Sequence, residues 1–255
     1  SFFDAGEYFD FDEFLRKAER LVDQGADFLD VGGVKAGPGP EVTVAEELER
    51  TVPAVAALVE RFDLPVSVDT FRGSVARACY EVGAVVGNDI SGFADPEFLT
   101  AAADHSASVV ACHIRLAPRV PDPDPNYEEH GGVINAVRIF CKDRAEQALA
   151  AGIPPQRIMV DAGLDLGKTP AMSAELLRHS DDLASLGFAV FLSASNKGFL
   201  GELVGAEVND RTESSLAALA LGIDRGCRVL RAHDVMGARR VADTMALLLE
   251  ERPAA

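Results

Sequence analysis

The chain has 255 residues, and its 41 acidic and 24 basic side chains give a formal charge of −17 with histidine neutral. Hydrophobic residues make up 48% of the chain, which is enough for a packed core and excludes an intrinsically disordered protein. The acidic charge argues against nucleic acid or an anionic membrane surface as a general partner, because both attract basic patches.

A unit of helix, glycine and short apolar run repeats along the chain. An apolar stripe predicts a first helix over 11–22, and Gly25 then precedes a predicted strand at 26–31. Thr43 and Glu46 form a capping box at the start of the next helix. Further strands are expected at 64–69, 84–89, 108–113, 157–161, 188–193 and 227–231. Further helices are expected after Asp95-Pro96 and over 133–151, 171–186, 212–225 and 237–251.

These seven strands alternate with helices and are apolar throughout, as strands of a parallel sheet are. They fit either an open doubly wound sheet or a (β/α)8 barrel, which needs eight strands, with the first strand before Ser1. Polar residues follow every strand rather than one switch point, which favours the barrel. We therefore predict an α/β fold, a TIM (β/α)8 barrel without its first strand, forming one domain over 1–255. The proline-rich segment 118–125 is expected to be a mobile loop over the site.

Polar residues mark the carboxyl end of each predicted strand, where barrel enzymes place their catalytic groups. Any one of them could be an ordinary polar residue at a junction, but their recurrence at all seven strands predicts a site. They are Asp30, Asp69, Asn88, Asp89, His113, Asp161, Ser193 to Lys197, Arg231 and His233.

Three of these residues are basic and follow the last two strands. Lys197, Arg231 and His233 lie where such barrels bind phosphate, and as three cations they would hold a phosphate or pyrophosphate. The alternative is that Arg231 is the partner of a structural ion pair.

A second group offers hydrogen-bond acceptors and one amide. Asp69, Asn88 and Asp161 suit a flat, nitrogen-rich heterocycle, although carboxylates also suit Mg²⁺. No HxH or HExxH spacing supports zinc.

Five motifs in register resemble the dihydropteroate synthases, the pterin-binding barrels of folate biosynthesis. The motifs are Ser67-Val68-Asp69-Thr70, Asn88-Asp89, Gly167-Lys168, Ser195-x-Lys197 and Arg231-x-His233. The opening Ser1-Phe2-Phe3-Asp4 is similar to the segment that follows the family's first strand, which carries an Asn-x-Thr-Pro-Asp motif. The resemblance covers nearly the whole chain.

The resemblance implies roles for these residues. Asp69, Asn88, Asp161 and Lys197 would hold the pterin, and Asp69, Asp161 and Lys197 would be the catalytic residues. Arg231, His233 and Ser195 would bind the pyrophosphate with Mg²⁺, whose asparagine ligand would lie before Ser1. Pyrophosphate would leave a pterin methyl pyrophosphate, and the amine of p-aminobenzoate would then attack. The family resemblance also implies a homodimer packed through its later helices.

The chain departs from the family motifs on the aminobenzoate side. In the family's Gly-Gly-Glu-Ser-Thr-Arg-Pro-Gly loop, this chain has Lys35, Ala36 and Gly37 in place of Ser-Thr-Arg. Asp165 and Leu166 replace the glycine and phenylalanine of Gly-Phe-Gly-Lys, and Asn196 and Gly198 replace two residues of Ser-Arg-Lys-Ser.

Three functional hypotheses follow. The chain is a dihydropteroate synthase with an altered loop, or a diverged relative that binds a pterin or related anion without making dihydropteroate. The third is a phosphate-handling lyase that uses Lys197 as a Schiff-base amine, although a loop lysine between Asn196 and Gly198 lacks the apolar pocket that would favour the neutral amine.

Cysteines and targeting signals indicate where the protein works. The four cysteines are scattered without a CxxC pair, which is typical of reduced, buried thiols. No apolar stretch reaches the ~20 residues of a membrane span, and no signal peptide opens the chain. We therefore expect a cytoplasmic protein.

Overall fold

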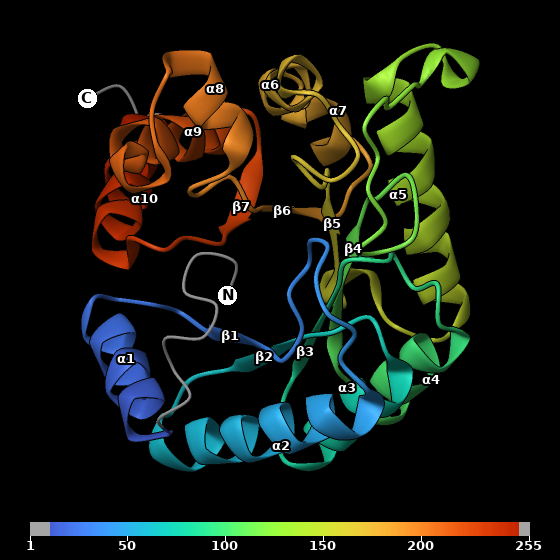
Figure 1. Cartoon of the computed structure of the whole chain (residues 1–255), viewed down its shortest axis with the longest axis vertical. Coiled ribbons are helices and arrows are strands. Elements are labelled where there is room, and N and C mark those ends of the chain that lie inside the picture. The colour runs from blue at the N-terminus through green and yellow to red at the C-terminus, as the bar shows by residue number, and fades with distance from the viewer. Residues whose placement is uncertain (1–10, 250–255) are drawn as a thin grey trace, which may run out of the picture.

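Seven parallel strands form one curled sheet in the computed structural model, which describes residues 11–249 (Figure 1). The strands pair in chain order, each one parallel to the next. They are β1 (Leu29–Gly32), β2 (Val66–Asp69), β3 (Val86–Asp89), β4 (Ser108–Cys112), β5 (Ile158–Asp161), β6 (Ala189–Leu192) and β7 (Cys227–Leu230). Each predicted strand is thus present, mostly shortened by a few residues at its start.

Helices surround this sheet. They are α1 (Phe11–Asp23), α2 (Val44–Arg61), α3 (Gly73–Glu81), α4 (Pro96–Asp104), α5 (Val133–Ala150), α6 (Pro170–Arg178), α7 (Ser180–Ala184), α8 (Gly198–Val204), α9 (Thr212–Asp224) and α10 (Val235–Leu249). Single 3₁₀ turns cover Glu128–His130, Pro155–Arg157 and Val208–Asp210. The capping box of Thr43 and Glu46 is confirmed, as is the Asp95 cap with Pro96 in the first turn of α4.

The helix predicted over 171–186 is wrong as a single element. It breaks at His179 into α6 and α7, because the backbone of His179 leaves the helical region. The Ser180 hydroxyl lies within hydrogen-bond distance of the carbonyls of Leu176 and Leu177, which competes with a continuous helix at this point. The short helix α8 is not predicted by the sequence at all.

The core lies between the strands and the helices. Val68 of β2, Val109 of β4 and Val160 of β5 are fully buried, as expected for a parallel sheet covered on both faces. All four cysteines are free and buried, which confirms the sequence prediction of buried thiols. None of the helices within 11–249 is long and apolar enough to cross a membrane.

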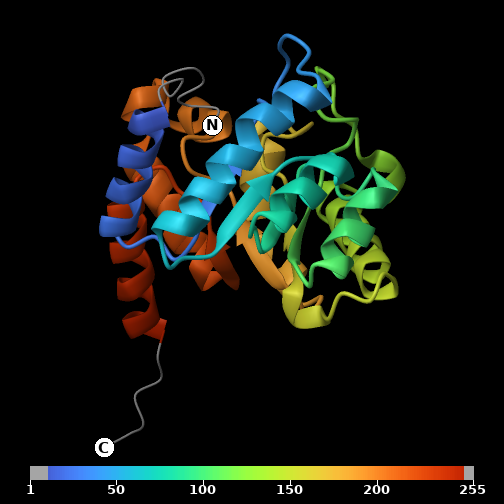
Figure 2. The same ribbon diagram turned by 90° about the horizontal axis from the view of Figure 1, so that it is seen from below.

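Side chains connect the two edges of the sheet. Within the described part of the chain no strand lies between β7 and β1, but Arg231 Nε lies 2.8 Å from Asp30 Oδ2. Arg239 of α10 donates to the carbonyl of Gly25 and pairs with Asp27, so α10 contacts the turn between α1 and β1, and the two helices lie on the same side of the molecule (Figure 2). The sheet therefore curls back on itself, as the predicted TIM barrel requires.

Candidate functional site

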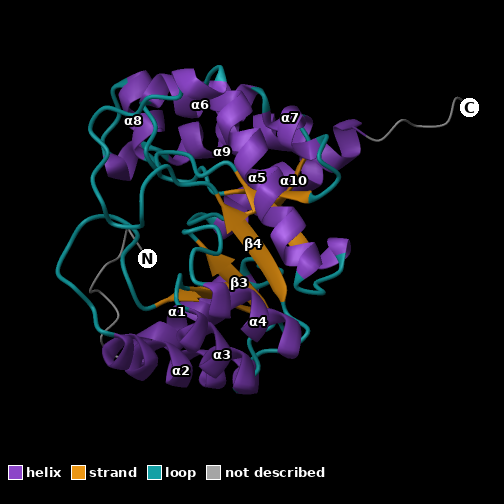
Figure 3. Ribbon diagram, turned by 90° about the vertical axis from the view of Figure 1, so that its right-hand side faces the viewer, coloured by secondary structure: helices purple, strands orange, loops and turns teal. Residues whose placement is uncertain are grey.

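Polar side chains from several strands converge at the carboxyl end of the sheet. The strand register pairs Gly32 with Asp69, Asp69 with Asn88, and Cys112 with Asp161. Because the strands are parallel, these residues lie at one rim of the sheet, which we call the mouth. The long loops that follow the strands gather on this side of the sheet (Figure 3).

Arg231 lies between two carboxylates at the mouth. Its Nε is 2.8 Å from Asp30 Oδ2, and its Nη2 is 3.6 Å from Asp69 Oδ2. Asn88 Nδ2 donates to the same Asp30 oxygen at 3.3 Å, whereas Asp30 Oδ1 is buried and has no hydrogen-bond partner among the described residues. The structural ion pair, the alternative that the sequence left open for Arg231, is therefore present.

Asp69 and Asp161 at the mouth hold their protons more tightly than usual. Burial, together with the neighbouring charge of Asp30, raises the pKa of Asp69 to about 7. Burial also raises the pKa of Asp161, although Asp161 Oδ1 accepts a hydrogen bond from the Gly163 amide at 2.8 Å. Near neutral pH, Asp69 can therefore either donate or accept a hydrogen bond.

The three predicted cations do not form one positive cluster. Burial, and then the charge of Arg231, lowers the pKa of His233 to about 4, so this imidazole is neutral at pH 7. Its Nδ1 lies 3.0 Å from Ser195 Oγ, which also accepts from the His233 amide at 3.1 Å. Lys197 Nζ donates to the Leu164 carbonyl at 3.1 Å. Arg231 and Lys197 are thus the cations at this site, and both already have partners.

Lys168 is a buried cation to which the sequence analysis gave no role. Its Nζ donates to the carbonyls of Gly163 and Leu166 at 2.8 and 2.9 Å, and to His113 Nδ1 at 2.9 Å. Burial lowers the pKa of Lys168 to about 8. The sequence signals for it are the Gly167-Lys168 motif and its place after a strand-end aspartate and a glycine-rich turn.

Gly163 is required where the loop after β5 begins. Its φ is +63°, and a Cβ there would lie 1.9 Å from the His113 carbonyl oxygen. The turn therefore accepts only glycine, and it brings the Gly163 amide to Asp161 and the Gly163 carbonyl to Lys168.

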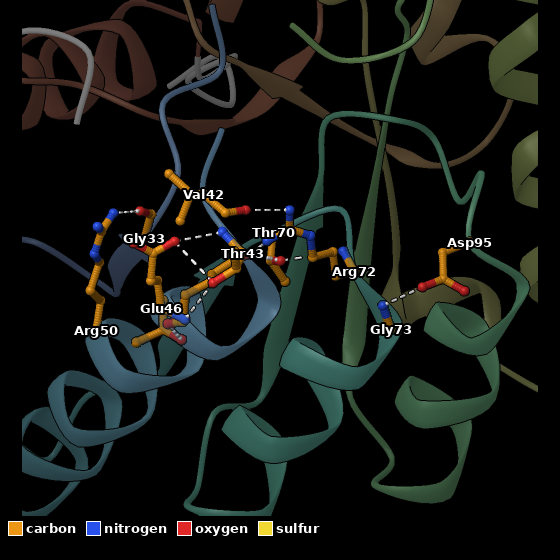
Figure 4. A network of polar contacts seen from close by, with 11 residues as sticks. Gly33, Val42, Thr43, Glu46, Arg50, Thr70, Arg72, Gly73 and Asp95 are labelled. Carbon is orange, nitrogen blue, oxygen red and sulfur yellow. Dashed lines mark hydrogen bonds and ion pairs between the residues drawn. The ribbon is translucent and has the colours of Figure 1, made fainter. Parts of the chain in front are cut away.

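Arginines hold the loop after β1, which carries Lys35, Ala36 and Gly37, at both of its ends (Figure 4). Arg50 Nη1 donates to the Gly33 carbonyl at 3.2 Å, and Arg72 Nη2 donates to the Val42 carbonyl at 2.7 Å.

Buried Glu47 fixes Arg72 in turn. It accepts from Arg72 Nη1 at 2.5 Å and from the Thr70 hydroxyl at 2.6 Å. Lys35 is exposed in the altered loop. Hydrogen bonds from Arg50 and Arg72 therefore hold this loop in place, although its sequence departs from the family motif.

The proline-rich loop after β4 is tied to both neighbouring loops. Arg119 donates to the Pro40 carbonyl, and the Tyr127 hydroxyl donates to the Gly167 carbonyl at 2.6 Å. Within the loop, Arg115 Nε donates to Asp122 Oδ2 at 2.5 Å.

The other altered positions lie in the loops after β5 and β6. The Asp165 carboxylate accepts from the Phe199 amide, and the Asn196 amide donates to Ser215 Oγ at 3.0 Å. The Leu166 carbonyl accepts from Lys168 Nζ at 2.9 Å. The altered residues of these two loops therefore adjoin one another, next to Lys197.

The described residues do not fit a metal ion held by the protein. Among residues 11–249 no group of three or more histidine, cysteine or acidic side chains could hold one. Asp30 and Asp69, two carboxylates at the mouth, are engaged by Arg231. The Mg²⁺ requirement stays a prediction, and no step below depends on it.

Comparisons with known proteins identify the family. The model of the pterin binding enzyme family matches residues 1–233. The chain is 40% identical to a protein named inactive dihydropteroate synthase 2 from Mycobacterium leprae over 99% of this chain and 88% of that protein. It is 35% identical to the dihydropteroate synthase of Synechocystis over 92% of this chain and 81% of that one.

Solved structures agree with these sequence matches. The Yersinia pestis dihydropteroate synthase, solved with a sulfonamide drug complex, superposes with a TM-score of 0.91 at 31% identity, covering 97% of this chain and 89% of that one. The Xanthomonas albilineans enzyme in complex with 7,8-dihydropteroate gives 0.84 at 34% identity over the same shares of the two chains. The TIM-barrel fold and the predicted family are confirmed, and the chain belongs to the dihydropteroate synthase family of pterin-binding enzymes as a divergent homologue.

Proposed function

We propose that this protein binds a pterin methyl pyrophosphate, or a related pterin and anion, at the mouth, and that p-aminobenzoate is not its second substrate. One observation carries this proposal. The strand-end residues Asp69, Asn88, Asp161 and Arg231 stand together at the mouth, while the departures from the family motifs lie in the surrounding loops. The M. leprae relative, which is 40% identical and named inactive, supports a chain that keeps the strand-end residues but does not make dihydropteroate.

The chemistry of the mouth suits a pterin. The carboxylate of Asp161 would accept hydrogen bonds from amino and ring N–H groups, and the Asn88 amide both donates and accepts. With a pKa of about 7, Asp69 can present either a donor or an acceptor to the ring. Lys197, whose Nζ donates to the Leu164 carbonyl, would lie against the edge of the same ring.

Arg231 would bind the anion while it remains paired with the carboxylates of Asp30 and Asp69. Protonation of Asp69 removes one of these negative charges, which favours a bound pyrophosphate electrostatically. His233 is neutral at pH 7 and so contributes a single hydrogen bond rather than a charge. The anion site is therefore weaker than three free cations would make it.

The family reaction would break the bond between the pterin methylene carbon and the pyrophosphate oxygen. The amine nitrogen of the second substrate would then bond to that carbon and lose a proton. The first step depends on the strand-end residues that this chain retains. The second depends on loops in which the Thr-Arg pair and the phenylalanine are absent, so we expect pterin binding without dihydropteroate formation.

Calorimetry and pyrophosphate release test this function. We expect pterin methyl pyrophosphate to bind, and to bind at least about tenfold more weakly to Asp161→Asn, because one charged hydrogen bond is lost. Glu128→Gln, an exposed change in the Glu128–His130 turn, is the matched control and should bind as the wild type does. Titration with and without Mg²⁺ tests the metal prediction.

Two results would decide between the hypotheses. No heat with any pterin would contradict the proposed function. Steady pyrophosphate release that depends on p-aminobenzoate would instead establish an active synthase with an altered loop, the second candidate.

We also propose a homodimer through α9 and α10. A groove of about 520 Å³ lies between these helices, lined in part by Leu216, Met236, Val241 and Met245. Apolar side chains along such a groove suit burial against a second copy. Sedimentation velocity should give a dimer, and Val241→Asp should shift it towards the monomer.

A further inference from the structure

Asp165 and Gly198 lie in different loops at the mouth, after β5 and after β6. The two carboxylate oxygens of Asp165 accept from the Phe199 amide at 3.2 and 3.3 Å. Phe199 is the second residue of α8, and the residue that precedes this helix, Lys197, makes no capping bond with its side chain. The Asp165 carboxylate therefore caps α8 from the neighbouring loop.

The backbone fixes the position of this carboxylate. Asp165 has a φ of +68°, a conformation that aspartate and asparagine tolerate better than most residues. Its amide donates to Ser173 Oγ at 3.1 Å. A Cβ on residue 198 would lie 3.3 Å from Asp165 Oδ2, which is tighter than an ordinary contact, so Gly198 leaves the space that the carboxylate occupies. Two departures from the family motifs thus fit one another.

The same two loops are also joined through a cation. Lys197 Nζ donates to the carbonyl of Leu164, the residue before Asp165. Asp165 is only partly buried, so it remains accessible from solvent in the loop after β5. A negatively charged group arriving there would be repelled by the carboxylate, and would find the Phe199 amide already used.

We propose that Asp165 determines specificity by excluding a second substrate that carries a negative charge. The acceptor that this mouth takes is then an amine without an acidic group. The inference rests on the proposed function, because a second substrate has meaning only if a pterin binds at the mouth. It would also account for the proposed exclusion of the anionic p-aminobenzoate without any change at the pterin side.

The test uses acceptors that differ only in charge. The protein is first saturated with 6-hydroxymethylpterin and inorganic pyrophosphate, which cannot react further, and then titrated with p-aminobenzoate or with the uncharged 4-aminobenzamide. We expect the wild type to bind the amide at least about tenfold more tightly than the acid.

Asp165→Asn is the decisive variant. It keeps the shape, the tolerance for the left-handed backbone and an oxygen for the Phe199 amide, but removes the charge. We expect p-aminobenzoate to gain about tenfold in affinity while 4-aminobenzamide changes less than about twofold. Asp182→Asn, an exposed aspartate in α7, is the matched control and should change neither affinity.

The outcomes of these titrations separate failure of the Asp165 proposal from failure of the proposed function. Equal affinity of the wild type for the two acceptors, an unchanged preference in Asp165→Asn, or no binding of either acceptor to protein that has taken up the pterin would overturn the inference. Failure of the proposed function is seen separately, as no heat with 6-hydroxymethylpterin itself, and would overturn both.

Discussion

The mouth of this barrel has two halves that are built in different ways. In the strand half, Asp30, Asp69, Asn88 and Asp161 stand on β1, β2, β3 and β5, and Arg231 follows β7 directly. The strand register sets the spacing between neighbouring members of this group. In the loop half, residues from the loops after β1, β4, β5 and β6 bond mainly to one another's backbone carbonyls and amides.

This difference shows how one half can change while the other is kept. A strand-end residue is placed by the whole sheet, and Asp30 and Asp69 are paired with Arg231 across the barrel. A loop residue needs only a few local partners, and the pair of Asp165 and Gly198 shows that one change can be accommodated by another. The loop half is therefore the part of the barrel where a new specificity is easiest to build.

Removing the central cation should damage the strand half most. In Arg231→Met, Asp30 and Asp69 lose their shared partner and remain largely buried beside each other. Because breaking one side of a buried ion pair leaves an uncompensated charge, we expect the free energy of unfolding to fall by about 3 kcal/mol. Urea unfolding monitored by circular dichroism measures it.

A second substitution separates the effect of the unpaired charge from the effect of lost packing in Arg231→Met. Asp30→Asn added to Arg231→Met removes the stranded charge and should restore part of the lost stability. A loss below about 1 kcal/mol in Arg231→Met would show that the ion pair is not a structural element of the strand half.

In the loop half, Lys168 is a buried cation comparable to Arg231. In Lys168→Met the carbonyls of Gly163 and Leu166 and the ring of His113 lose a buried donor, so we expect a loss of about 2 kcal/mol. The loss is smaller than at Arg231 because the variant also removes the cost of burying an ammonium group. Lys142→Met, at an exposed pair with Glu146, is the control and should cost less than about 0.5 kcal/mol. Equal losses of unfolding free energy in Lys168→Met and Lys142→Met would mean that Lys168 does not stabilise the loop after β5.

Sequence reasoning succeeded where the fold itself places a residue. Glycine and apolar runs located all seven strands, and the end of each strand then indicated Asp69, Asn88, Asp161 and Arg231 as a group. Capping patterns located the starts of α2 and α4 because a cap is formed by residues close in the sequence.

The same reasoning failed where contacts join distant loops. The bonds of Lys168, the cap of α8 by Asp165 and the identity of Asp30 as the partner of Arg231 all depend on backbone positions that no local pattern specifies. Two of them follow from left-handed residues, Gly163 and Asp165, whose φ angles turn the loop after β5 back on itself. Burial then changed the chemistry further, since it leaves His233 neutral where the sequence suggested a cation.

A pH profile distinguishes the titration of Asp69 from that of His233. The pKa of Asp69 is about 7 in the folded protein against an ordinary 3.8, so its contribution to stability falls as pH rises through this interval. His233, with a pKa of about 4 against 6.5, contributes in the opposite sense and loses stability as pH falls from 6.5 to 4. Asp69→Asn removes only the first effect.

We therefore expect Asp69→Asn to be more stable relative to the wild type at pH 8 than at pH 4. Urea unfolding of both proteins at these two pH values measures the difference. The same relative stability at both values would contradict the raised pKa of Asp69.

The smallest expected effect on stability tests whether the loop half acts as one unit. Arg119→Ala removes the only hydrogen bond recorded between the loops after β1 and β4 in the described chain, the one to the Pro40 carbonyl. Both partners are near the surface, so the free energy of unfolding should change by less than about 0.5 kcal/mol. Cleavage of the two loops by a protease should nevertheless become faster, because the loops no longer support each other. Arg138→Ala on the exposed side of α5 is the matched control. If both variants were cleaved at the wild-type rate, the loops after β1 and β4 would be positioned independently, each by its own anchors in the barrel.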